Sequence, residues 1–446
     1  MHLEKKMTTT RWGRFLVRRL LQLDRPAPLR LSSEVAAEVE RNYRWNFTVN
    51  MLDGTAFWFG LNTISSATII PLYVSKLSDS TVLIGLVAVL AQAGWLLPQL
   101  FVAGLVERLP RKKPMVINVG FFTERLPTWL WPLSALLVPF SPIAALVLFF
   151  VGFAWHHLGA GVIGPAWQDM IARCFPVNRR GRYFGTTTFI GTGVGALGAL
   201  LSGWLLETYP FPFNFAYIFL IAAIAVNVSW AFLSLTREPV QPAEPSPHAP
   251  PRLWGKLVAI VKADVNFRNY LIARITLAFG SMGLGFVTVA AVQRLNVSDI
   301  TVGLFTVALL VGQTAGNLLA GWLADRFGHK GPLEAAGLCA AAAFGLVWLE
   351  PGVDWYFLAF GLLGISVGAS IVSGLLIVLE FSRPEQRPTY VGIANTGVGV
   401  GSAIAPLVGG WLAGASYGWL FALSALVSVA SVALMSVTVK DPRDSH

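Results

Sequence analysis

The sequence predicts an all-α membrane protein with twelve transmembrane helices in two pseudo-symmetric six-helix bundles. Three observations predict this fold: apolar segments recur along almost the whole chain, basic residues sort to one side of a membrane, and the two halves share residues at fixed offsets. Hydrophobic side chains make up 55% of the 446 residues and charged ones 13%, which is more apolar surface than one soluble core can bury.

The spans follow from apolar runs of about 20 residues, which are long enough to cross a hydrocarbon core of about 30 Å. Backbone groups in lipid must bond within a helix or a closed barrel, and these Gly-, Ala- and Leu-rich runs lack the alternation of barrel strands. The predicted helices cover residues 46–74, 82–106, 115–138, 143–171, 184–206, 215–235, 270–293, 301–324, 333–349, 355–379, 391–415 and 420–438.

Lys and Arg set the predicted orientation. With the N-terminus inside, the inner segments hold 29 of the 33 basic residues, and the outer loops hold only Lys76 and Arg294. Both termini are therefore predicted on the cytoplasmic side of a cell inner membrane or plasma membrane. The formal net charge of +10 follows mostly from this sorting, so no nucleic-acid partner is predicted.

A proline-rich segment divides the chain. Residues 236–253 contain six prolines and no apolar period, which indicates an extended cytoplasmic linker. Near the N-terminus, Trp12, Phe15 and Leu16 lie beside arginines in a pattern typical of an amphipathic helix on anionic lipid, and a disordered basic tail fits nearly as well. The predicted domains are a cytoplasmic basic segment at 1–45, an N-terminal six-helix bundle at 46–235, a cytoplasmic linker at 236–269, a C-terminal six-helix bundle at 270–438 and a cytoplasmic tail at 439–446.

The two halves repeat each other. At an offset of 218, Gly85 matches Gly303 and Pro114 matches Pro332. A glycine-rich stretch of the predicted fifth helix recurs in the eleventh at an offset of 206. Two such echoes indicate a duplicated architecture.

Residues 321–330 read Gly-Trp-Leu-Ala-Asp-Arg-Phe-Gly-His-Lys, and residues 103–112 are a degenerate copy. With the duplication, this segment resembles the inner-loop signature G-x-L-A-D-R-x-G-R-K of the major facilitator superfamily, although the family normally carries its better copy in the first half. The resemblance implies a loop that locks one conformation, while a basic loop that only sets topology is the alternative. Arg111, Lys112 and Lys330 are expected near the lipid surface. The predicted gate residues are Glu107, Arg108, Asp325, Arg326, Gly328 and Lys330.

Charged groups inside spans are costly and are functional candidates by default. Asp53 shares a helix face with Asn46 and Asn50, and Glu124 and Arg125 lie at mid-depth of the third span. Because adjacent helix residues point about 100° apart, Glu124 and Arg125 are expected to find partners on other helices. The proton-coupling candidates are Asp53, Glu124 and His156, with mutual neutralisation of buried polar groups as the alternative. The substrate-cavity candidates are Asn62, Gln92, Arg125, His157 and Arg274.

Other patterns indicate structure instead of chemistry. Residues 193–198 fit a dinucleotide-binding G-x-G-x-x-G pattern, but they lie inside an apolar span with no preceding strand, so helix packing explains them better. The adjacent His156 and His157 diverge and make a poor metal site. No nucleophile elbow or phosphate loop occurs, so neither an enzyme nor a cofactor is predicted. Asp169 and Arg173 are expected to form a structural bridge at the inner end of the fourth span. The predicted packing residues are Gly193, Gly195, Gly401, Pro406 and Gly409.

Together these patterns predict a secondary active transporter that moves a small solute by alternating access. Without a nucleotide-binding segment, an ion gradient must supply the energy, and a proton is the favoured ion. Acidic groups and aromatic residues favour export of amphipathic or cationic compounds. Uptake by symport and a non-transporting membrane chaperone or sensor on the same fold are the alternatives. The expected partners are the solute, a proton or another ion and the lipid bilayer, and a monomer is favoured.

Overall fold

The computed structural model describes residues 11–26, 28, 30–107, 109–176, 179–240, 259–349, 352–381 and 387–441. Within these ranges all regular elements are helices and no strand occurs, which confirms the all-α prediction. Ten helical stretches in the described ranges are long and apolar enough to cross a membrane. They are carried by α5 (Thr81–Glu107), α7 (Pro142–Cys174), α8 (Arg180–Thr208), α9 (Phe213–Ser234), α11 to α12 (Val265–Leu295), α13 (Asp299–Phe327), α14 (Lys330–Trp348), α15 (Val353–Phe381), α16 (Arg387–Ala415) and α17 (Tyr417–Thr438).

The first and third predicted spans are not among these ten. The first is split into α3 (Ser32–Thr63) and α4 (Ile69–Leu77), and α3 carries several buried polar side chains. The third consists of two π-helical segments, η1 (Met115–Val119) and η2 (Phe121–Arg125), then the 3-10 turn η3 (Leu126–Trp129) and α6 (Leu130–Leu137). Pro127, which has no backbone N–H, accounts in part for this irregular hydrogen bonding. The count of twelve stays a prediction.

The seventh predicted span is also broken. It consists of α11 (Val265–Gly280), the 3-10 turn η5 (Ser281–Gly283) and α12 (Leu284–Leu295). At the break, the Ser281 hydroxyl donates to the carbonyl of Leu277 at 3.1 Å. The same carbonyl also accepts from the Ser281 backbone amide, so the hydroxyl adds a second bond where the α-helix ends.

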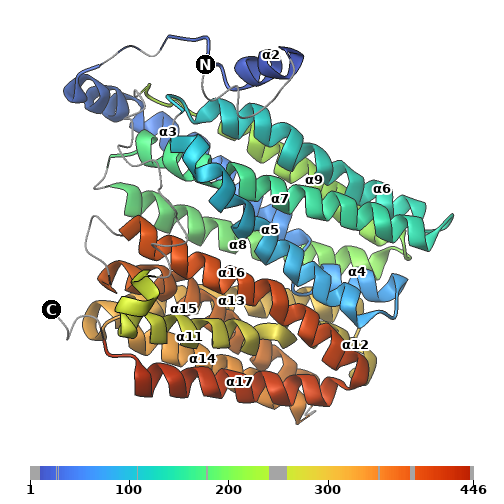
Figure 1. The fold of residues 1–446 in the computed structure, drawn as a ribbon. Coiled ribbons are helices and arrows are strands. Elements are labelled where there is room, and N and C mark those ends of the chain that lie inside the picture. The colour runs from blue at the N-terminus through green and yellow to red at the C-terminus, as the bar shows by residue number, and fades with distance from the viewer. Residues whose placement is uncertain are drawn as a thin grey trace.

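The helices run along a common direction in two groups (Figure 1). Elements α3 to α9 lie above α11 to α17 in this view. We refer to residues 32–234 as the first half and to residues 265–438 as the second half. The halves meet along two seams, where α5 contacts α16 and α8 contacts α13. In each seam the second helix of one half therefore packs on the fifth helix of the other.

Glycines allow the close approach at both seams. A Cβ atom on Gly85 of α5 would lie 2.2 Å from the carbonyl oxygen of Pro406 in α16. A Cβ atom on Gly303 of α13 would lie 2.7 Å from the Cα of Gly203 in α8. Neither position has room for a side chain without backbone movement. Because Gly85 and Gly303 match at the repeat offset, the duplication places the same residue at equivalent contacts.

Polar contacts join the halves at one end of the molecule. The hydroxyls of Thr68 and Thr306 lie 2.5 Å apart, and the Lys76 ammonium lies 2.6 Å from the Asp299 carboxylate. Thr81 Oγ1 donates to the carbonyl of Gly410 at 2.6 Å. We call this region, residues 64–85 together with 284–306 and 406–410, the closed end.

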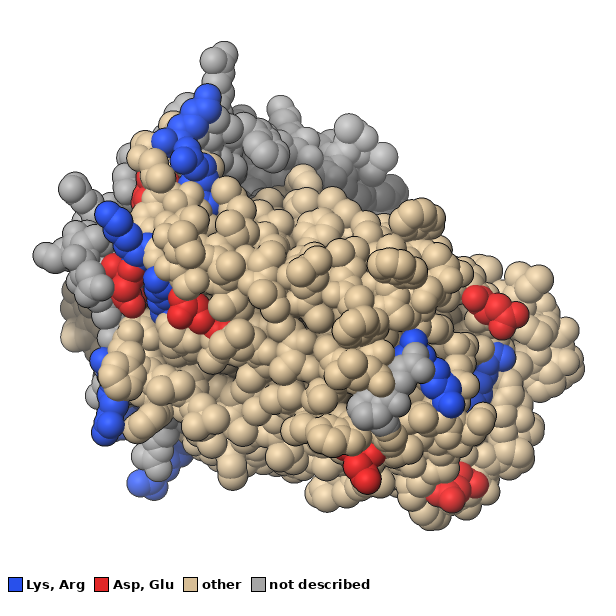
Figure 2. Space-filling view, turned by 90° about the horizontal axis from the view of Figure 1, so that it is seen from below, with Lys and Arg blue, Asp and Glu red and all other residues tan. Residues whose placement is uncertain are grey.

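Charges gather toward the ends of the molecule (Figure 2). A broad band without Lys, Arg, Asp or Glu separates them on the face shown. Large apolar side chains are exposed along the helices, among them Phe101, Leu318 and Trp411. An apolar band between charged ends is the surface expected of a protein that spans a bilayer.

The N-terminal segment forms the predicted helix over part of its length. Helix α2 (Arg11–Leu20) exposes Phe15 and Leu16, and Leu21 directly after it is buried in a core with Val116 and Met170. Asn118 Nδ2 donates to the carbonyl of Leu20 at 2.7 Å. These contacts favour the amphipathic helix over a disordered tail for residues 11–21.

Candidate functional site

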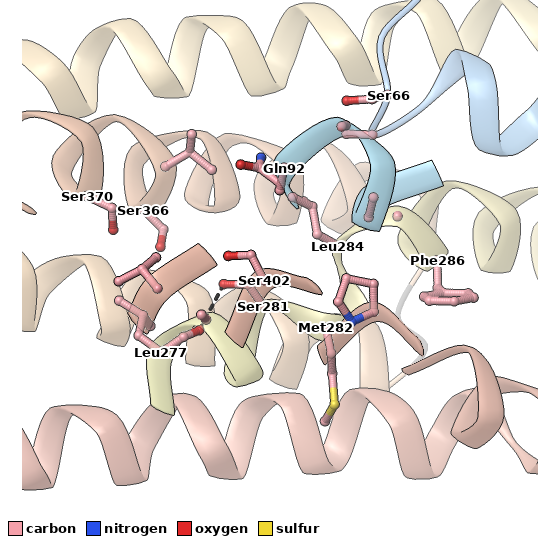
Figure 3. Close-up of a pocket in the computed structure, with 18 of the residues that line it drawn as sticks. Ser66, Gln92, Leu277, Ser281, Met282, Leu284, Phe286, Ser366, Ser370 and Ser402 are labelled. Atoms are coloured by element: carbon pink, nitrogen blue, oxygen red, sulfur yellow. Dashed lines mark hydrogen bonds between the residues drawn. The ribbon is translucent and has the colours of Figure 1, made fainter. Parts of the chain in front are cut away.

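A cavity of about 360 Å³ lies between the halves. The first half contributes the turn before α4 and the face of α5 that carries Ile84 and Gln92. The second half contributes α11, η5, α12, α15 and α16. Figure 3 shows Ser66 and Gln92 on one side of this space and Ser281, Ser366, Ser370 and Ser402 on the other. The cavity is therefore built from both halves, next to the seam where Gly85 meets Pro406.

The cavity wall is mostly apolar with hydroxyl groups set into it. Alanines, leucines and Phe286 supply the apolar surface, and five serines with Gln92 supply neutral polar groups. Arg274 is the one charged residue among the described residues that line it. Of the predicted cavity candidates, the structure places Gln92 and Arg274 on this wall.

The other charged candidates form a separate buried cluster inside the first half. Asp53 of α3 accepts a hydrogen bond from the Ser229 hydroxyl of α9 at 2.6 Å. His156 Nδ1 of α7 donates to the carbonyl of Glu124 at 2.8 Å, and Asp53 lies within electrostatic range of Glu124 and Arg125. We call Asp53, Glu124, Arg125 and His156 the buried cluster, since each is almost fully buried.

Within this cluster, Glu124 and Arg125 pair with each other, so the expectation of separate partners is wrong. Arg125 Nη1 lies 3.1 Å from Glu124 Oε1. The expectation assumed a regular α-helix, whereas both residues end a π-helical segment whose turn is wider. The guanidinium also lies 5.2 Å from the ring centre of Phe57. A flexible arginine in an irregular turn can thus fold back onto its neighbour.

His157 and Asn62 lie outside both the cavity wall and the buried cluster. His157 Nδ1 donates to the carbonyl of Phe153 at 2.9 Å, and its backbone packs against Gly94 of α5. Asn62 Nδ2 donates to the carbonyl of Trp58 at 2.9 Å. Each side chain is bonded within its own helix. No group of three His, Cys, Asp or Glu residues in the described ranges could hold a metal ion.

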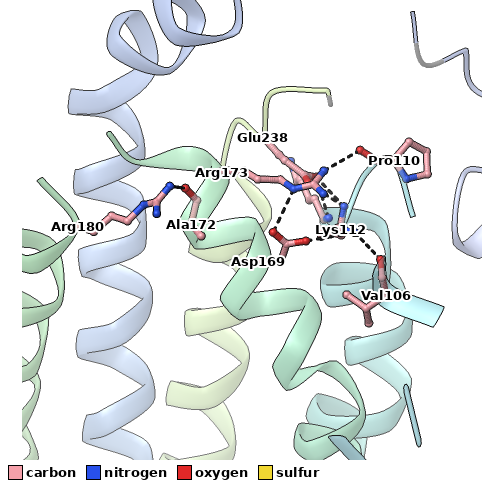
Figure 4. Close-up of polar contacts among 9 residues, drawn as sticks. Val106, Pro110, Lys112, Asp169, Ala172, Arg173, Arg180 and Glu238 are labelled. Atoms are coloured by element: carbon pink, nitrogen blue, oxygen red, sulfur yellow. Dashed lines mark hydrogen bonds and ion pairs between the residues drawn. The ribbon is translucent and has the colours of Figure 1, made fainter. Parts of the chain in front are cut away.

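An ion-pair network lies at the end of the first half opposite the closed end (Figure 4). Asp169 of α7 accepts from Lys112 Nζ and from Arg173 Nε, each at 3.2 Å. Arg173 Nη1 also donates to the carbonyl of Pro110 at 3.1 Å, and Lys112 Nζ donates to the carbonyl of Val106. The predicted bridge between Asp169 and Arg173 is confirmed.

Lys112 is fully buried, which corrects its predicted place near the lipid surface. Its ammonium is held by the Asp169 carboxylate and a backbone carbonyl, and these partners make burial of the charge tolerable. Burial lowers the pKa of Lys112, although the Asp169 carboxylate acts in the opposite direction. The sequence shows the charge but not the carboxylate that receives it 57 positions later.

Glu238 is a charged residue that the sequence patterns did not single out. Its carboxylate accepts from the backbone amides of Lys112 at 2.8 Å and of Lys113 at 2.9 Å. Burial raises the pKa of Glu238, and the amide hydrogen bonds oppose this shift. The carboxylate sits at the start of the third span, where free amides favour an anion. Its position directly after a predicted span, at the head of the linker, was the available signal.

The start of the linker is bound to α3 through the predicted polar stripe. Asn46 accepts from the Arg237 amide at 2.9 Å and donates to the Arg237 carbonyl at 3.0 Å. Thr236 Oγ1 donates to Asn50 Oδ1 at 3.2 Å. Asn46 and Asn50 therefore hold residues 236–237 in place, a structural task apart from that of Asp53.

The predicted gate residues are only partly described. Arg108 and the side chains of Glu107 and Asp325 lie outside the described residues. Arg326 is exposed, with its guanidinium 4.6 Å from the ring centre of Trp322. Gly328 ends α13 at a φ of +81°, against Asp441, and Lys330 Nζ donates to the carbonyl of Ser436 at 3.2 Å. The second loop thus contacts the segment at the end of α17, and its gating role stays a prediction.

The predicted packing residues fall into two groups. A Cβ atom would lie 2.4 Å from Asn62 at Gly195, 3.3 Å from Ala278 at Gly401 and 2.7 Å from Met282 at Gly409. Pro406 contacts Gly85 as described above. A Cβ atom on Gly193 would meet no atom within 4 Å. The packing role predicted for Gly193 is therefore not what the structure shows, because this face of α8 has no neighbour there.

Comparisons with known proteins agree with this fold. The family model described as Major Facilitator Superfamily matches residues 270–446. A 3-(3-hydroxy-phenyl)propionate transporter of Escherichia coli (strain K12) is 32% identical over 131 residues, 28% of this chain and 31% of that protein. A cis,cis-muconate transport protein of Acinetobacter baylyi is 27% identical over 153 residues, 33% of this chain and 36% of that protein. The chain spans about a third of the length of these relatives.

A solved structure extends the likeness to nearly the whole chain. A D-xylose-proton symporter has a TM-score of 0.64 at 16% identity, and the match covers 89% of this chain and 98% of that chain. At this identity the likeness concerns the fold alone. The second half thus matches the Major Facilitator Superfamily model, and the two halves together share the fold of a solved transporter.

Proposed function

We propose that the protein is a secondary transporter that moves a small solute across the cell inner or plasma membrane by alternating access. The observation that carries this proposal is the cavity lined by both halves. Rocking of one half against the other changes access to a site at their interface. The family and its transporter relatives indicate that the protein is not an enzyme. Given the predicted orientation, the closed end faces outward, and the conformation is closed to the outside.

The proposed architecture has twelve spans, formed by the ten apolar helices with the α3–α4 and η1–α6 stretches. The low hydropathy of α3 comes from polar residues that have partners inside the protein, since Asn46 bonds to Arg237 of the linker and Asp53 to Ser229 of α9. It therefore does not prevent a buried helix from spanning. The domain boundaries proposed are those predicted from the sequence, with both termini and the linker 236–269 in the cytoplasm and a monomer as the working unit.

Proton coupling is proposed for the buried cluster. A carboxylate held among few partners in a membrane domain is a costly group whose presence calls for a function. Asp53 bonds to α9 through Ser229, and Glu124 bonds to α7 through its carbonyl and to Arg125 through its carboxylate. A proton taken up here would change the attraction among four helices. Because these residues do not line the cavity, the proton would act on helix packing and not on the solute directly.

Symport is the proposed direction of coupling. The expectation of export rested on acidic groups in the cavity, and the described residues that line the cavity include no Asp or Glu. The two relatives reported above are transporters named for organic acids, 3-(3-hydroxy-phenyl)propionate and cis,cis-muconate. These names support a small polar solute.

Reconstitution tests the proposal. Purified protein in liposomes with an internal pH dye would be offered pools of small carboxylates, polyols and cationic amphiphiles. We expect solute-dependent proton flux in the wild type, loss of that flux in Glu124→Gln, and retention in Glu207→Gln, an exposed control at the end of α8. Solute uptake without proton flux would overturn the coupling. Folded protein that moves no solute would favour a partner-binding role instead.

A further inference from the structure

We propose that the central cavity takes a small organic anion whose carboxylate binds to Arg274, an inference that rests on the proposed transport function. Arg274 projects from α11 and is the one charged residue on the described cavity wall. A cavity with a single fixed positive charge favours a ligand with a negative charge. The proposal names the substrate class of the site.

Neutral groups are the partners that the protein itself gives to Arg274. Nη1 lies 3.4 Å from the Ser370 hydroxyl, and the Tyr270 hydroxyl is a second contact. The Nε donor is buried without a hydrogen-bond partner. Within the described part of the chain, no carboxylate lies within salt-bridge distance of this guanidinium. A half-buried guanidinium with few acceptors is stabilised when an anion arrives.

The other arginine inside a span shows the contrast. Arg125 is almost fully buried and pairs with Glu124 at 3.1 Å. Its positive charge is thus balanced by the protein, away from the cavity. Arg274 has no such balance and lies where a ligand can reach it. The difference indicates that its missing counter-charge comes from outside the protein.

The surrounding wall fits the rest of a small carboxylate. Gly374 leaves room for the guanidinium, because a Cβ atom there would lie 2.6 Å from Nη2. Ser366, Ser402 and Gln92 offer neutral donors and acceptors, and leucine and alanine side chains offer apolar contact. A volume of about 360 Å³ is near the lower limit of pockets that hold small molecules. Cationic amphiphiles would meet a like charge and no carboxylate on this wall.

Matched ligand pairs test the inference by binding alone. The purified full-length protein would be titrated with a panel of small carboxylates, such as 3-phenylpropionate, and with their carboxamides, which keep the shape and remove the charge. We expect at least about tenfold tighter binding of a carboxylate than of its amide, since charge-assisted hydrogen bonds to arginine are lost in the amide. Equal affinities, or no carboxylate-dependent signal across the panel, would overturn the proposal.

Variants of Arg274 assign the effect to this residue. Arg274→Gln should remove the preference for the carboxylate, and Arg274→Lys should keep part of it, because lysine retains the charge but not the planar fork. Arg268→Gln on the same helix, which does not line the cavity, is the matched control. Unchanged carboxylate affinity in a folded Arg274→Gln protein would contradict the proposal. If the glutamine variant does not fold, a carboxylate preference in Arg274→Lys equal to that of the wild type would contradict it instead.

Transport assays separate this inference from the proposed function. Uptake of a neutral solute by wild type and Arg274→Gln alike would leave the transporter standing and remove the anion site. Binding of carboxylates that depends on Arg274, without movement of any solute, would keep the anion site and remove the transporter.

Discussion

The third span of each half begins at a matched proline, yet the two spans fold differently. After Pro114 the chain forms two π segments and a 3-10 turn that carry Glu124 and Arg125. After Pro332, α14 continues without a break, and alanines 342 and 343 stand at the offset of 218 from those charges. The second half therefore packs its third span without charged residues at these positions. Glu124 and Arg125 are an addition to the first half, at a cost that points to a task beyond packing.

The strongest way to break this comparison is to remove one charge of the pair. Arg125→Ala should lower the free energy of unfolding by about 3–5 kcal/mol, because it leaves Glu124 buried without its partner. The double variant Glu124→Ala with Arg125→Ala copies the second half and should lose much less stability. Denaturant unfolding in detergent would measure both. If the double variant were as unstable as the single one, the pair would be needed for packing after all.

A second test compares the sixth helices of the two halves. Ser229 donates to the Asp53 carboxylate at 2.6 Å, and Ser431 of α17 donates to the neutral carbonyl of Ala273 at 2.8 Å. Ser229→Ala should cost about 1.5–3 kcal/mol and Ser431→Ala about 0.5–1.5 kcal/mol, since hydrogen bonds to charged groups are stronger. The same unfolding measurement would rank them. Equal losses would indicate that Asp53 is neutral in the folded protein.

The seams test whether the halves are equivalent where they touch. Gly85→Ala and Gly303→Ala should each destabilise the closed conformation by about 1–3 kcal/mol through overpacking. Gly193→Ala is the matched control in open space, and its effect should be small or slightly stabilising. Accessibility of a cysteine placed at the closed end would report the conformation. A large effect at one seam alone would show that the two seams contribute unequally to the stability of the closed conformation.

The smallest expected effect is a pH dependence at Glu238, whose carboxylate accepts from the amides of Lys112 and Lys113 at the start of the third span. The pKa of Glu238 is raised above its ordinary value of 4.5. The folded protein therefore holds this proton at pH values at which the unfolded chain has already lost it. Its contribution to stability is greatest at low pH and falls as pH rises through the raised pKa. Glu238→Gln lacks this titration. Melting temperatures from about pH 4 to about pH 8 should therefore show the wild type losing stability relative to the variant, and a relative gain would contradict the assignment.

Most of the helices could be predicted because their signal is local. Apolar runs indicate length and position, and the repeat that matches Gly85 with Gly303 pointed to residues that lie at both seams. The irregular third span could not be read from hydropathy, because π, 3-10 and α-helical stretches of the same residues are equally apolar. Their difference lies in backbone hydrogen bonding, which depends on neighbours such as α7.

The candidate site was predicted residue by residue but not as an arrangement. Arg125 was predicted to line the cavity with Gln92 and Arg274, whereas the structure places it in the buried cluster, paired with Glu124. A single sequence gives the depth of a residue along a helix and not the rotation of that helix against its neighbours. The burial of Lys112 was missed for a related reason, since its partner Asp169 belongs to another helix.

The glycine seams also bear on how such a protein can be recombined. Gly85 packs directly against the backbone of Pro406, and Gly303 packs directly against Gly203. Each half therefore has a surface that fits only a matching surface on the other half. Consider a chimaera in which one half is replaced by the corresponding half of a relative, with the junction in the linker. The junction would avoid the helices, but the contacts at both seams would still be disrupted. Exchange of whole halves should succeed only when the incoming half brings seam residues that fit the half that stays.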